Sequence, residues 1–389
     1  MRYAAAVLVA VALTASACTD STTPAEPEIG LAPTTAAGAG QIPGRFIVTL
    51  RERVEPAGVA REYGVRPDFV YRHALNGFAG AISDAARSGL LRDARVARVE
   101  PDGIATIVTT QSGATWGLDR IDQRGLPLSG SFTYTRTGAG VRVYIIDTGI
   151  RTAHSEFGGR ASSGFDAVDG GAADDCNGHG THVAGTVGGA TYGVAKGARL
   201  VAVRVLNCSG SGTWSGVIAG LDWVTANRVR PAVANMSLGG GRNASVDDAV
   251  RRMIGSGVAT AVAAGNGNLA GVAQDACKSS PSRVAPAMTI GATSQNDRKA
   301  SWSNYGKCVD WFAPGVSIRS AWHTGNTATN TISGTSMATP HTAGVAALYL
   351  EGHSAASPVQ VRDALFSAAT KNVVTSSKTA NNHILFTSY

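Results

Sequence analysis

The sequence predicts an α/β fold in which a doubly wound, mostly parallel sheet forms the larger part and a small α+β domain precedes it. Two observations indicate the sheet: short, uninterrupted apolar runs recur along the second part of the chain, and helical patterns separate them. Strands buried on both faces have this texture, and their alternation with helices is typical of parallel sheets. A strand–helix–strand–strand–helix–strand pattern near the N-terminus indicates the small domain.

The composition is that of a globular protein with a large core. The 389 residues are 44% apolar and 16% charged, which excludes a disordered chain, and the length allows two or three domains. The net charge is +7, but lysine and arginine are scattered and form no block. We therefore expect no nucleic-acid partner.

The N-terminus has the features of an export signal over residues 1–17. Arg2 precedes an apolar stretch at 4–13, and the Ala-Ser-Ala tripeptide at 15–17 is a small-x-small cleavage pattern. The stretch is too short to be a permanent transmembrane segment, and we expect none. The sequence thus predicts a secreted, extracellular protein, with a lipid anchor on Cys18 as the alternative.

A spacer and a small domain follow the signal. Residues 18–41 are rich in Thr, Ala, Pro and Gly, which is typical of a flexible linker. The small domain spans 42–108, where Asn76-Gly77 supplies turn residues and Ser83 a helix cap. Its expected elements are strands at 46–50, 96–99 and 104–108, a hairpin over 70–82, and helices at 56–63 and 84–91.

The larger domain spans 109–389. Its expected strands lie at 141–146, 200–206, 233–236, 258–264 and 287–290, and its expected helices at 182–187, 214–227, 246–256 and 340–350. In sheets of this kind the ligand site lies beyond the carboxyl ends of the strands.

The remaining cysteines fit an oxidising compartment. Four of them allow three connectivities, and the sequential pairs would close loops of similar length. A zinc site is not expected from them, because no Cys-x-x-Cys pair occurs. They are Cys176, Cys208, Cys277 and Cys308.

An acid and a histidine follow in positions suited to catalysis. Asp147 comes directly after the run at 141–146, where an orienting carboxylate would be placed, although an Asp that caps a turn is the alternative. Asp147-Thr148-Gly149 also resembles the motif of aspartic proteases, but these need a second copy and the sequence has none. His179 stands between two glycines before a helix, whose dipole would disfavour the imidazolium and keep the base neutral. With His182 it could instead bind zinc, although no third ligand or Glu accompanies the pair.

A serine and an asparagine complete a possible site. Ser336 is surrounded by small residues, and Pro340 is expected in the first turn of the helix that follows. Ser336 would then lie beside unpaired backbone N–H groups; an ordinary helix cap is the alternative interpretation. Asn266 follows the run at 258–264 and could donate its amide to an oxyanion. The four side chains together supply a nucleophile, a base, an orienting acid and an oxyanion donor.

Longer stretches around these residues resemble the subtilisin-like serine proteases (subtilases), and among them the proteinase K-like branch, close to aqualysin-type secreted bacterial enzymes. The likeness covers essentially everything from Thr109 onward and keeps the order Asp, His, Ser. The similar stretches are Tyr144 to Gly149, Asn177 to His182, Ser333 to His341, Trp116 to Gln123, Gly210 to Trp214 and Ala263 to Asn266.

The resemblance implies roles for the candidate residues. Ser336 would be the nucleophile, His179 the general base and acid, Asp147 the group that orients His179, and Asn266 the oxyanion donor. It also implies the disulfides Cys176–Cys208 and Cys277–Cys308. Residues 42–108 would be an inhibitory propeptide that assists folding and is removed autocatalytically between Val108 and Gln111, its strand at 104–108 lying in the active cleft.

The resemblance further implies where peptides bind. A substrate strand would pair between two enzyme segments, with broad preference for apolar and aromatic residues before the cut. Trp214 would shape the pocket four residues upstream of that cut. The implied substrate-binding residues are Gly210, Trp214, Leu238, Gly239, Gly240, Ala264 and Gly265.

Structural calcium is implied at two places, and no cofactor is implied for catalysis. Asp310 would bind calcium together with carbonyls near Ala285 and Ala287. A second site would use Asp119, Asp122 and Gln123, although Ser129 and Ser131 stand where it would have carboxylates.

The resulting prediction is a secreted serine endopeptidase, made as a self-processing zymogen and monomeric when mature. The alternative is a catalytically inactive binding protein of the same fold.

Overall fold

The computed structural model describes residues 41–103 and 109–389. The chain divides into two compact units, residues 1–106 and 107–389, and each is described by itself. The expected signal at 1–17, nearly all of the spacer at 18–41 and the expected strand at 104–108 lie outside the described residues.

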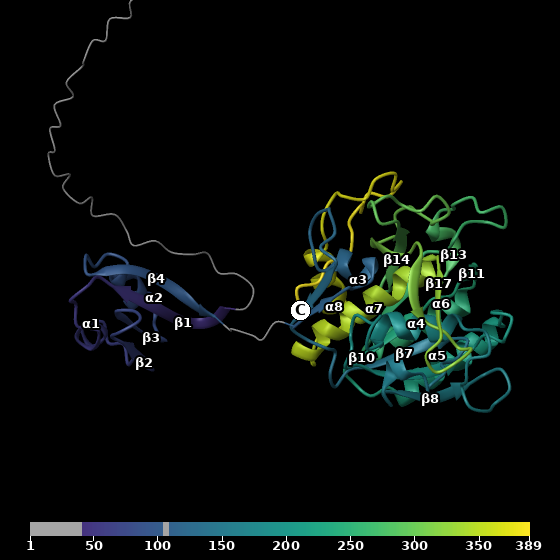
Figure 1. Cartoon of the computed structure of the whole chain (residues 1–389), viewed down its shortest axis with the longest axis horizontal. Coiled ribbons are helices and arrows are strands. Elements are labelled where there is room, and N and C mark those ends of the chain that lie inside the picture. The colour runs from purple at the N-terminus through teal and green to yellow at the C-terminus, as the bar shows by residue number, and fades with distance from the viewer. Residues whose placement is uncertain (1–40, 104–108) are drawn as a thin grey trace, which may run out of the picture. The chain divides into compact units, whose positions relative to one another are not determined.

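The first unit is a four-stranded antiparallel sheet packed against two helices, as expected (Figure 1). Its elements are β1 (Gln41–Leu50), α1 (Pro56–Glu62), β2 (Phe69–Tyr71), β3 (Gly77–Ala81), α2 (Asp84–Leu90) and β4 (Val96–Gly103), in the sheet order β2-β3-β1-β4. Ser83 caps α2 by accepting from the Ala86 N–H. Val48, Val59, Phe78 and Leu90 are buried in one cluster to which strands and helices both contribute, so this unit has its own core.

The second unit contains the parallel sheet that the apolar runs predict. Seven strands lie in the order β15-β14-β12-β10-β7-β9-β8, and every neighbouring pair is parallel. They are β7 (Arg142–Asp147), β8 (Ala161–Asp166), β9 (Arg199–Arg204), β10 (Ala232–Met236), β12 (Val258–Ala263), β14 (Met288–Thr293) and β15 (Trp311–Pro314). β8 and β15 have no counterpart among the expected strands.

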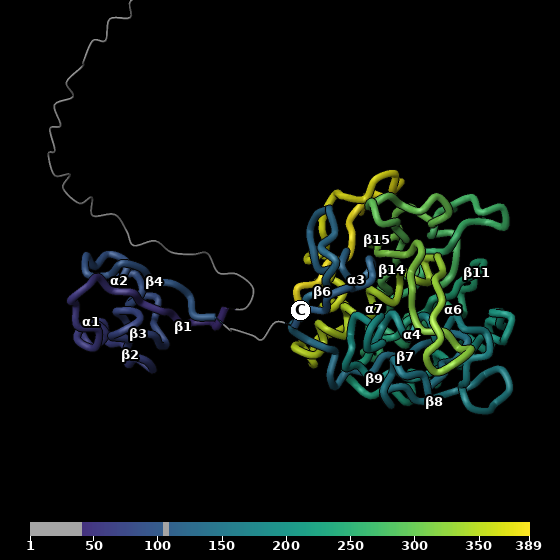
Figure 2. The backbone as a smooth tube through the Cα atoms, in the orientation of Figure 1, coloured from purple at the N-terminus to yellow at the C-terminus, as the bar shows by residue number. Residues whose placement is uncertain are grey.

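Helices cover both faces of this sheet, which confirms the doubly wound α/β architecture. One core cluster joins residues of α4, α7 and α8, and a second, on the other face, joins residues of α5 and α6. Figures 1 and 2 show α4 and α7 next to each other, and the two helices are in contact. The helices are α3 (Trp116–Ile121), α4 (His179–Gly188), α5 (Trp214–Asn227), α6 (Ala244–Gly255), α7 (Thr335–Gly352) and α8 (Pro358–Ala368).

Short elements complete the unit. They are β5 (Thr109–Ser112) paired with β6 (Ser131–Tyr134), β11 (Gly240–Gly241) paired with β13 (Ser279–Ser280), β16 (Ile318–Ala321) paired with β17 (Thr329–Ile332), and the 3-10 turns η1 (Ser155–Phe157) and η2 (Ala276–Lys278). No helix among residues 41–103 and 109–389 is both long and apolar enough to span a bilayer.

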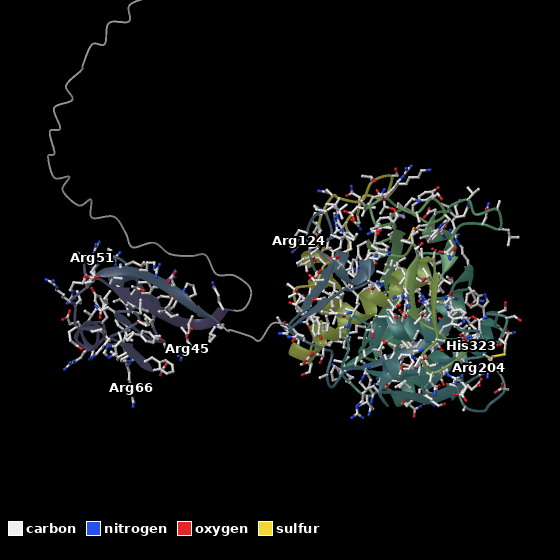
Figure 3. All side chains as sticks on the ribbon, in the orientation of Figure 1. Arg45, Arg51, Arg66, Arg124, Arg204 and His323 are labelled. Atoms are coloured by element: carbon white, nitrogen blue, oxygen red, sulfur yellow. A yellow bond between two sulfur atoms is a disulfide. The ribbon has the colours of Figure 1, made fainter. Side chains whose placement is uncertain are left out.

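Two disulfides join the cysteines in the pairing that the resemblance implies. Cys176 is bonded to Cys208, and Cys277 to Cys308. The first lies beside the buried Arg204, which bonds Asp166 Oδ2 at 2.8 Å and approaches Cys176 Sγ at 3.5 Å (Figure 3). The Cys176–Cys208 disulfide therefore links the loop before α4 to the segment that follows β9.

The strand order reverses between β7 and β10. From β7 the chain adds β8 and β9 on one side, and it then crosses to add β10, β12, β14 and β15 on the other. A crevice forms at such a switch point, beyond the carboxyl ends of the strands. Asp147 ends β7, and the segment after β10 begins at Ser237, so both lie at this crevice.

Candidate active site

Asp147 and His179 form a short hydrogen bond at the centre of the candidate site. Asp147 Oδ1 lies 2.7 Å from His179 Nδ1, and the Asp147 side chain is fully buried while that of His179 is 26% exposed. A carboxylate can only accept a hydrogen bond, so Nδ1 carries the proton and Nε2 is left as the acceptor. The Thr148 N–H also donates to Asp147 Oδ1, at 2.8 Å, which fixes the carboxylate.

A buried acid organises the loop that delivers His179. Asp175 accepts hydrogen bonds from the N–H groups of Asn177, Gly178 and Thr181 and from the hydroxyls of Thr148 and Thr181. A carboxylate before a helix is favourable because the N-terminal end of the helix dipole is positive. Gly178 adopts φ +110°, and a Cβ there would come within 2.5 Å of the Trp322 ring, so only glycine suits this turn.

The helix dipole was expected to lower the pKa of His179 and keep its ring neutral, but the pKa is raised instead. Burial disfavours the imidazolium, but the adjacent Asp147 carboxylate outweighs it by charge and by hydrogen bonding, and the pKa of His179 is raised above 6.5. Asp175 adds to this effect, so the loop favours the cation despite the helix. Such a site stabilises an imidazolium once it forms.

Ser336 is the second residue of α7, at its buried N-terminus. Its Oγ donates to the carbonyl of Ser237, 3.1 Å away, and no hydrogen bond joins it to His179 among the described residues. In this structure the Ser336 hydroxyl is therefore engaged by the Ser237 carbonyl and not by His179.

Pro340 is not in the first turn of its helix, which corrects the expectation from sequence. α7 begins at Thr335, so Pro340 is its sixth residue and lies inside the helix. The Ser336 carbonyl, which would normally accept from the N–H of residue 340, accepts instead from the Ser237 hydroxyl at 2.8 Å. This contact between distant segments allows the helix to begin earlier than the proline predicts.

Asn266 is held with its amide nitrogen available. Its Oδ1 accepts from the N–H and the hydroxyl of Thr335, at 2.9 and 2.8 Å. Its Nδ2 has no acceptor among the described residues, and neither has the backbone N–H of Ser336. Two donors are thus unpaired at the start of α7, where the helix dipole is positive.

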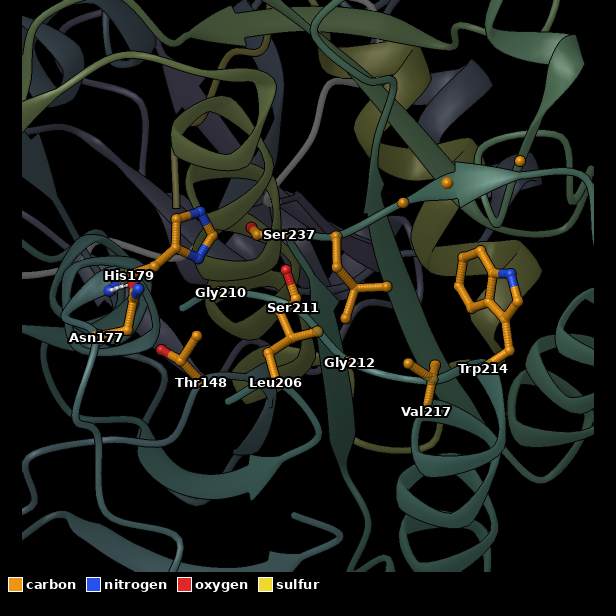
Figure 4. Close-up of a pocket in the computed structure, with 14 residues that line it drawn as sticks. Thr148, Asn177, His179, Leu206, Gly210, Ser211, Gly212, Trp214, Val217 and Ser237 are labelled. Atoms are coloured by element: carbon orange, nitrogen blue, oxygen red, sulfur yellow. Dashed lines mark hydrogen bonds between the residues drawn. The ribbon is translucent and has the colours of Figure 1, made fainter. Parts of the chain in front are cut away.

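A cleft of about 470 Å³ runs from His179 along the neighbouring loops (Figure 4). His179 and Trp214 lie at opposite ends of it in Figure 4. Apart from His179, no ionisable side chain occurs among the described residues that line it. Those residues are Thr148, Asn177, His179, Leu206, Gly210, Ser211, Gly212, Trp214, Val217, Ser237, Leu238, Gly239, Gly240 and Gly241.

The cleft contains five of the seven expected substrate-binding residues. Gly240 packs against Trp214, since a Cβ at this glycine would come 2.7 Å from the indole. Ala264 and Gly265 do not line this cleft: Ala264 is fully buried, and the Gly265 N–H donates to Thr335 Oγ1. They hold the loop that carries Asn266.

The carboxylate at the first expected calcium site is already paired. One oxygen of Asp310 accepts from the Thr289 N–H at 2.8 Å, and the other forms an ion pair with Arg362. This guanidinium supplies to Asp310 the positive charge that a metal would otherwise supply. The residues as arranged therefore do not fit a calcium ion at Asp310.

The second expected calcium site has a free carboxylate oxygen. Asp119 accepts from Ser129 and Gly130, and Gln123 Oε1 accepts from the Ser129 N–H. Asp122 accepts from the Thr133 N–H through Oδ2, but its buried Oδ1 has no donor. Burial, helped by the charge of Asp119, raises the pKa of Asp122 to about 6, so a cation would be favourable there. No cluster of three or more His, Cys, Asp or Glu suited to a metal occurs in the part of the chain that the structure describes.

His182 has a structural environment. It is fully buried, its Nε2 lies 2.9 Å from the Ile318 carbonyl, and its pKa is lowered to about 4 by burial. His179 Nδ1 is engaged by Asp147 instead, so the two rings take different partners on the same helix.

Three supporting residues were not recognised as such from the sequence. Asp175 stands three residues before Gly178, the N-cap of α4, which is outside the positions that capping patterns use, so no local signal indicated it. Thr335 and Ser237 act through contacts with segments 69 and 99 residues away in the chain, which no local pattern indicates.

Comparisons with known proteins agree with this geometry. Residues 138–385 match the Subtilase family. The chain is 52% identical over 375 residues to an extracellular serine proteinase of Thermus sp. (strain Rt41A), covering 90% of both chains. It is 51% identical over 331 residues to alkaline serine exoprotease A of Vibrio alginolyticus, covering 83% of this chain and 61% of that one.

A solved structure gives the same answer. The crystal structure of a cold adapted subtilisin-like serine proteinase superposes with a TM-score of 0.68 at 54% identity, covering 71% of this chain and 98% of that one. The match to the family, the relatives and the parallel sheet with helices on both faces agree. The chain belongs to the subtilase family of serine proteases, which are hydrolases.

Proposed function

We propose that this subtilase is a secreted endopeptidase that cleaves peptide bonds through an acyl-enzyme on Ser336, with His179 as general base and acid and Asp147 as the group that orients His179. The observation that carries the proposal is the 2.7 Å hydrogen bond between Asp147 and His179 Nδ1. It leaves Nε2 as a base in the cleft that Ser237 also lines, and Ser237 is hydrogen-bonded to Ser336.

The proposed reaction uses these groups as follows. Nε2 of His179 takes the proton of Ser336 Oγ, which attacks the peptide carbonyl, and the imidazolium is stabilised by Asp147. The oxyanion is bound by the unpaired Ser336 N–H and by Asn266 Nδ2. His179 then returns the proton to the leaving amine. Water then takes the place of the amine: it gives a proton to His179 Nε2 and attacks the acyl carbonyl, and the bond to Ser336 Oγ breaks as His179 gives that proton back to Oγ.

The cleft supports a broad preference for apolar and aromatic residues before the cut. Leu238 and the glycine backbone at 239–241 line it together with Leu206 and Val217, and no charge among them would select Lys or Arg. β11 pairs with β13 at Gly240, so its other edge is available for a substrate strand. Trp214 at the far end would contact the residue four positions upstream of the cut.

Residues 42–108 are proposed as the propeptide of a self-processing zymogen, exported by the signal at 1–17. The first unit has its own core, which suits a domain that folds and is then removed. The expected cut between Val108 and Gln111 falls beside the boundary of the two units, and Thr109–Ser112 pairs with β6 of the second unit. The export of the Thermus relative, whose name calls it extracellular, supports secretion.

Structural calcium is proposed at Asp122, with Asp119 and Gln123 beside it. The orphaned Oδ1 of Asp122 supports this choice, and the Arg362 pair argues against the site at Asp310. Calcium would add a positive charge to a buried acidic group and would take no part in the chemistry.

Hydrolysis of casein tests the proposed function against its rivals. The full chain should cleave casein, a serine-directed sulfonyl fluoride should block cleavage, and Ser336→Ala should abolish it. A binding protein of the same fold would show no cleavage at all. A metal hydrolase that used His179 and His182 would survive the sulfonyl fluoride.

A further inference from the structure

The first turns of α7, the helix that carries Ser336, lack one backbone hydrogen bond. Pro340 has no N–H, so it cannot donate to the carbonyl of Ser336, four residues earlier. Ser336 is buried, and a buried carbonyl without a donor costs free energy. The defect falls on the residue whose position matters most for the proposed chemistry.

Ser237 supplies the missing donor. Its hydroxyl, 3% exposed as a residue, donates to the Ser336 carbonyl at 2.8 Å. Asn235 Nδ2 donates to the same hydroxyl oxygen at 2.9 Å. Asn235 thereby leaves the single hydroxyl hydrogen of Ser237 for the Ser336 carbonyl.

Ser237 and Ser336 form two reciprocal hydrogen bonds, each between the hydroxyl of one serine and the carbonyl of the other. While the Ser237 hydroxyl donates to the Ser336 carbonyl, the Ser237 carbonyl accepts from Ser336 Oγ at 3.1 Å. Ser237 also lines the cleft and directly precedes Leu238, so the same residue belongs to the substrate-binding segment. Both the main chain and the side chain of Ser336 are thus hydrogen-bonded to a residue that lines the cleft.

We propose that Ser237 is a positioning residue for Ser336: its hydroxyl stands in for the N–H that Pro340 lacks and sets the first turn of α7 against the cleft. The inference rests on the proposed function, in which Ser336 is the nucleophile. It follows that the Ser237 hydroxyl matters because residue 340 is a proline. An N–H at 340 should make the hydroxyl dispensable.

The test is a double-mutant cycle on the enzyme processed from the full chain. Ser237→Ala should lower kcat on a peptide amide about tenfold, change KM less than twofold, and slow modification by a sulfonyl fluoride in parallel. Pro340→Ala restores an N–H that can donate to the Ser336 carbonyl. The double variant should therefore recover to within about twofold of Pro340→Ala alone.

A matched serine controls for the general loss of a buried hydroxyl. Ser282 is also 3% exposed, and its hydroxyl donates to the Ala276 carbonyl at 2.8 Å, away from Ser336. The effect of Ser282→Ala, whatever its size, should be the same with Pro or Ala at 340. If the Ser237→Ala effect is likewise unchanged by Pro340→Ala, or if Ser237→Ala keeps kcat within twofold, the positioning role is wrong.

Two further comparisons keep the result interpretable. If Ser237→Ala yields no folded enzyme, the comparison of the double variant with Pro340→Ala decides: equal activity supports the proposal, and a tenfold deficit contradicts it. Failure of the proposed function would look different, because wild-type enzyme would then resist the sulfonyl fluoride and Ser336→Ala would remain active.

Discussion

Nδ1 of His179 lies 2.7 Å from Oδ1 of the fully buried Asp147, and this contact raises the pKa of the histidine despite its burial. The pair connects the first residue of α4 to the last residue of β7. Its geometry places the ring proton on Nδ1 and leaves Nε2 as an acceptor, and its charge raises the pH at which the ring becomes neutral.

The fall of kcat/KM at low pH should be set by the Asp147–His179 pair. Activity requires neutral His179, so kcat/KM should rise with pH and reach half its plateau above pH 6.5, because the pKa of His179 is raised. Asp147→Asn should move this midpoint to lower pH and reduce kcat by about 10⁴-fold. The nearby, exposed Asp174 provides the control, since Asp174→Asn should leave the midpoint unchanged.

Replacing Asn266 by Asp should separate its two roles. The substitution keeps an oxygen for the N–H and hydroxyl of Thr335 but removes the Nδ2 donor. We expect kcat to fall by about 10²–10³ with little change in KM, because the lost bond acts on the oxyanion of the transition state. Asn268→Asp, two residues away, should have no such effect; a change confined to KM in Asn266→Asp would contradict the oxyanion role.

Trp214→Ala should alter the far end of the cleft only. The indole packs on Gly240, and its removal widens the cleft at the end opposite His179. For peptides that extend four residues upstream of the cut, KM should rise severalfold and the preference for an aromatic residue at that position should weaken. Peptides with only two upstream residues serve as the internal control, because equal losses on long and short peptides would refute the assignment.

Asp122 should make stability depend on pH in a definite direction. The pKa of Asp122 is raised from 3.8 to about 6, so its contribution is fully present below pH 3.8 and is lost as the pH rises through 6. Asp122→Asn should therefore match wild type near pH 4 and exceed it at pH 7 by about 1–2 kcal/mol, after allowance for partial exposure.

Calcium provides the second arm of that experiment. Both proteins are unfolded by heat in the Ser336→Ala background, which should prevent self-digestion. Millimolar calcium should stabilise the chain that retains Asp122 more than the Asp122→Asn variant if the ion binds there. Equal responses to calcium would remove the proposed site, and a stability difference that does not change with pH would contradict the raised pKa.

Much of the sheet could be predicted because its central strands are buried on both faces. β7, β9, β10 and β12 begin and end within about two residues of apolar runs in the sequence. β8 was missed because it is an edge strand with the polar sequence Ala-Ser-Ser-Gly-Phe-Asp, which pairs on one side only. Periodicity carries no signal for such a strand.

The site was predictable where residues adjoin strand ends, and less so where distant segments meet. Asp147 could be placed from the strand that it ends. The start of α7 could not, because a proline inside a helix is tolerated here through Ser237, 99 residues earlier in the chain. The pKa of His179 could not be predicted either, since it depends on the partners Asp147 and Asp175 rather than on the helix alone.

The central claim is that Ser336 forms the covalent intermediate, and peptide mapping after reaction with a sulfonyl fluoride tests it most directly. Mass spectrometry should find one adduct per chain, on Ser336, with loss of activity in proportion to labelling, and His179→Ala should label far more slowly. An adduct on another residue, or full activity with Ser336 labelled, would contradict the account.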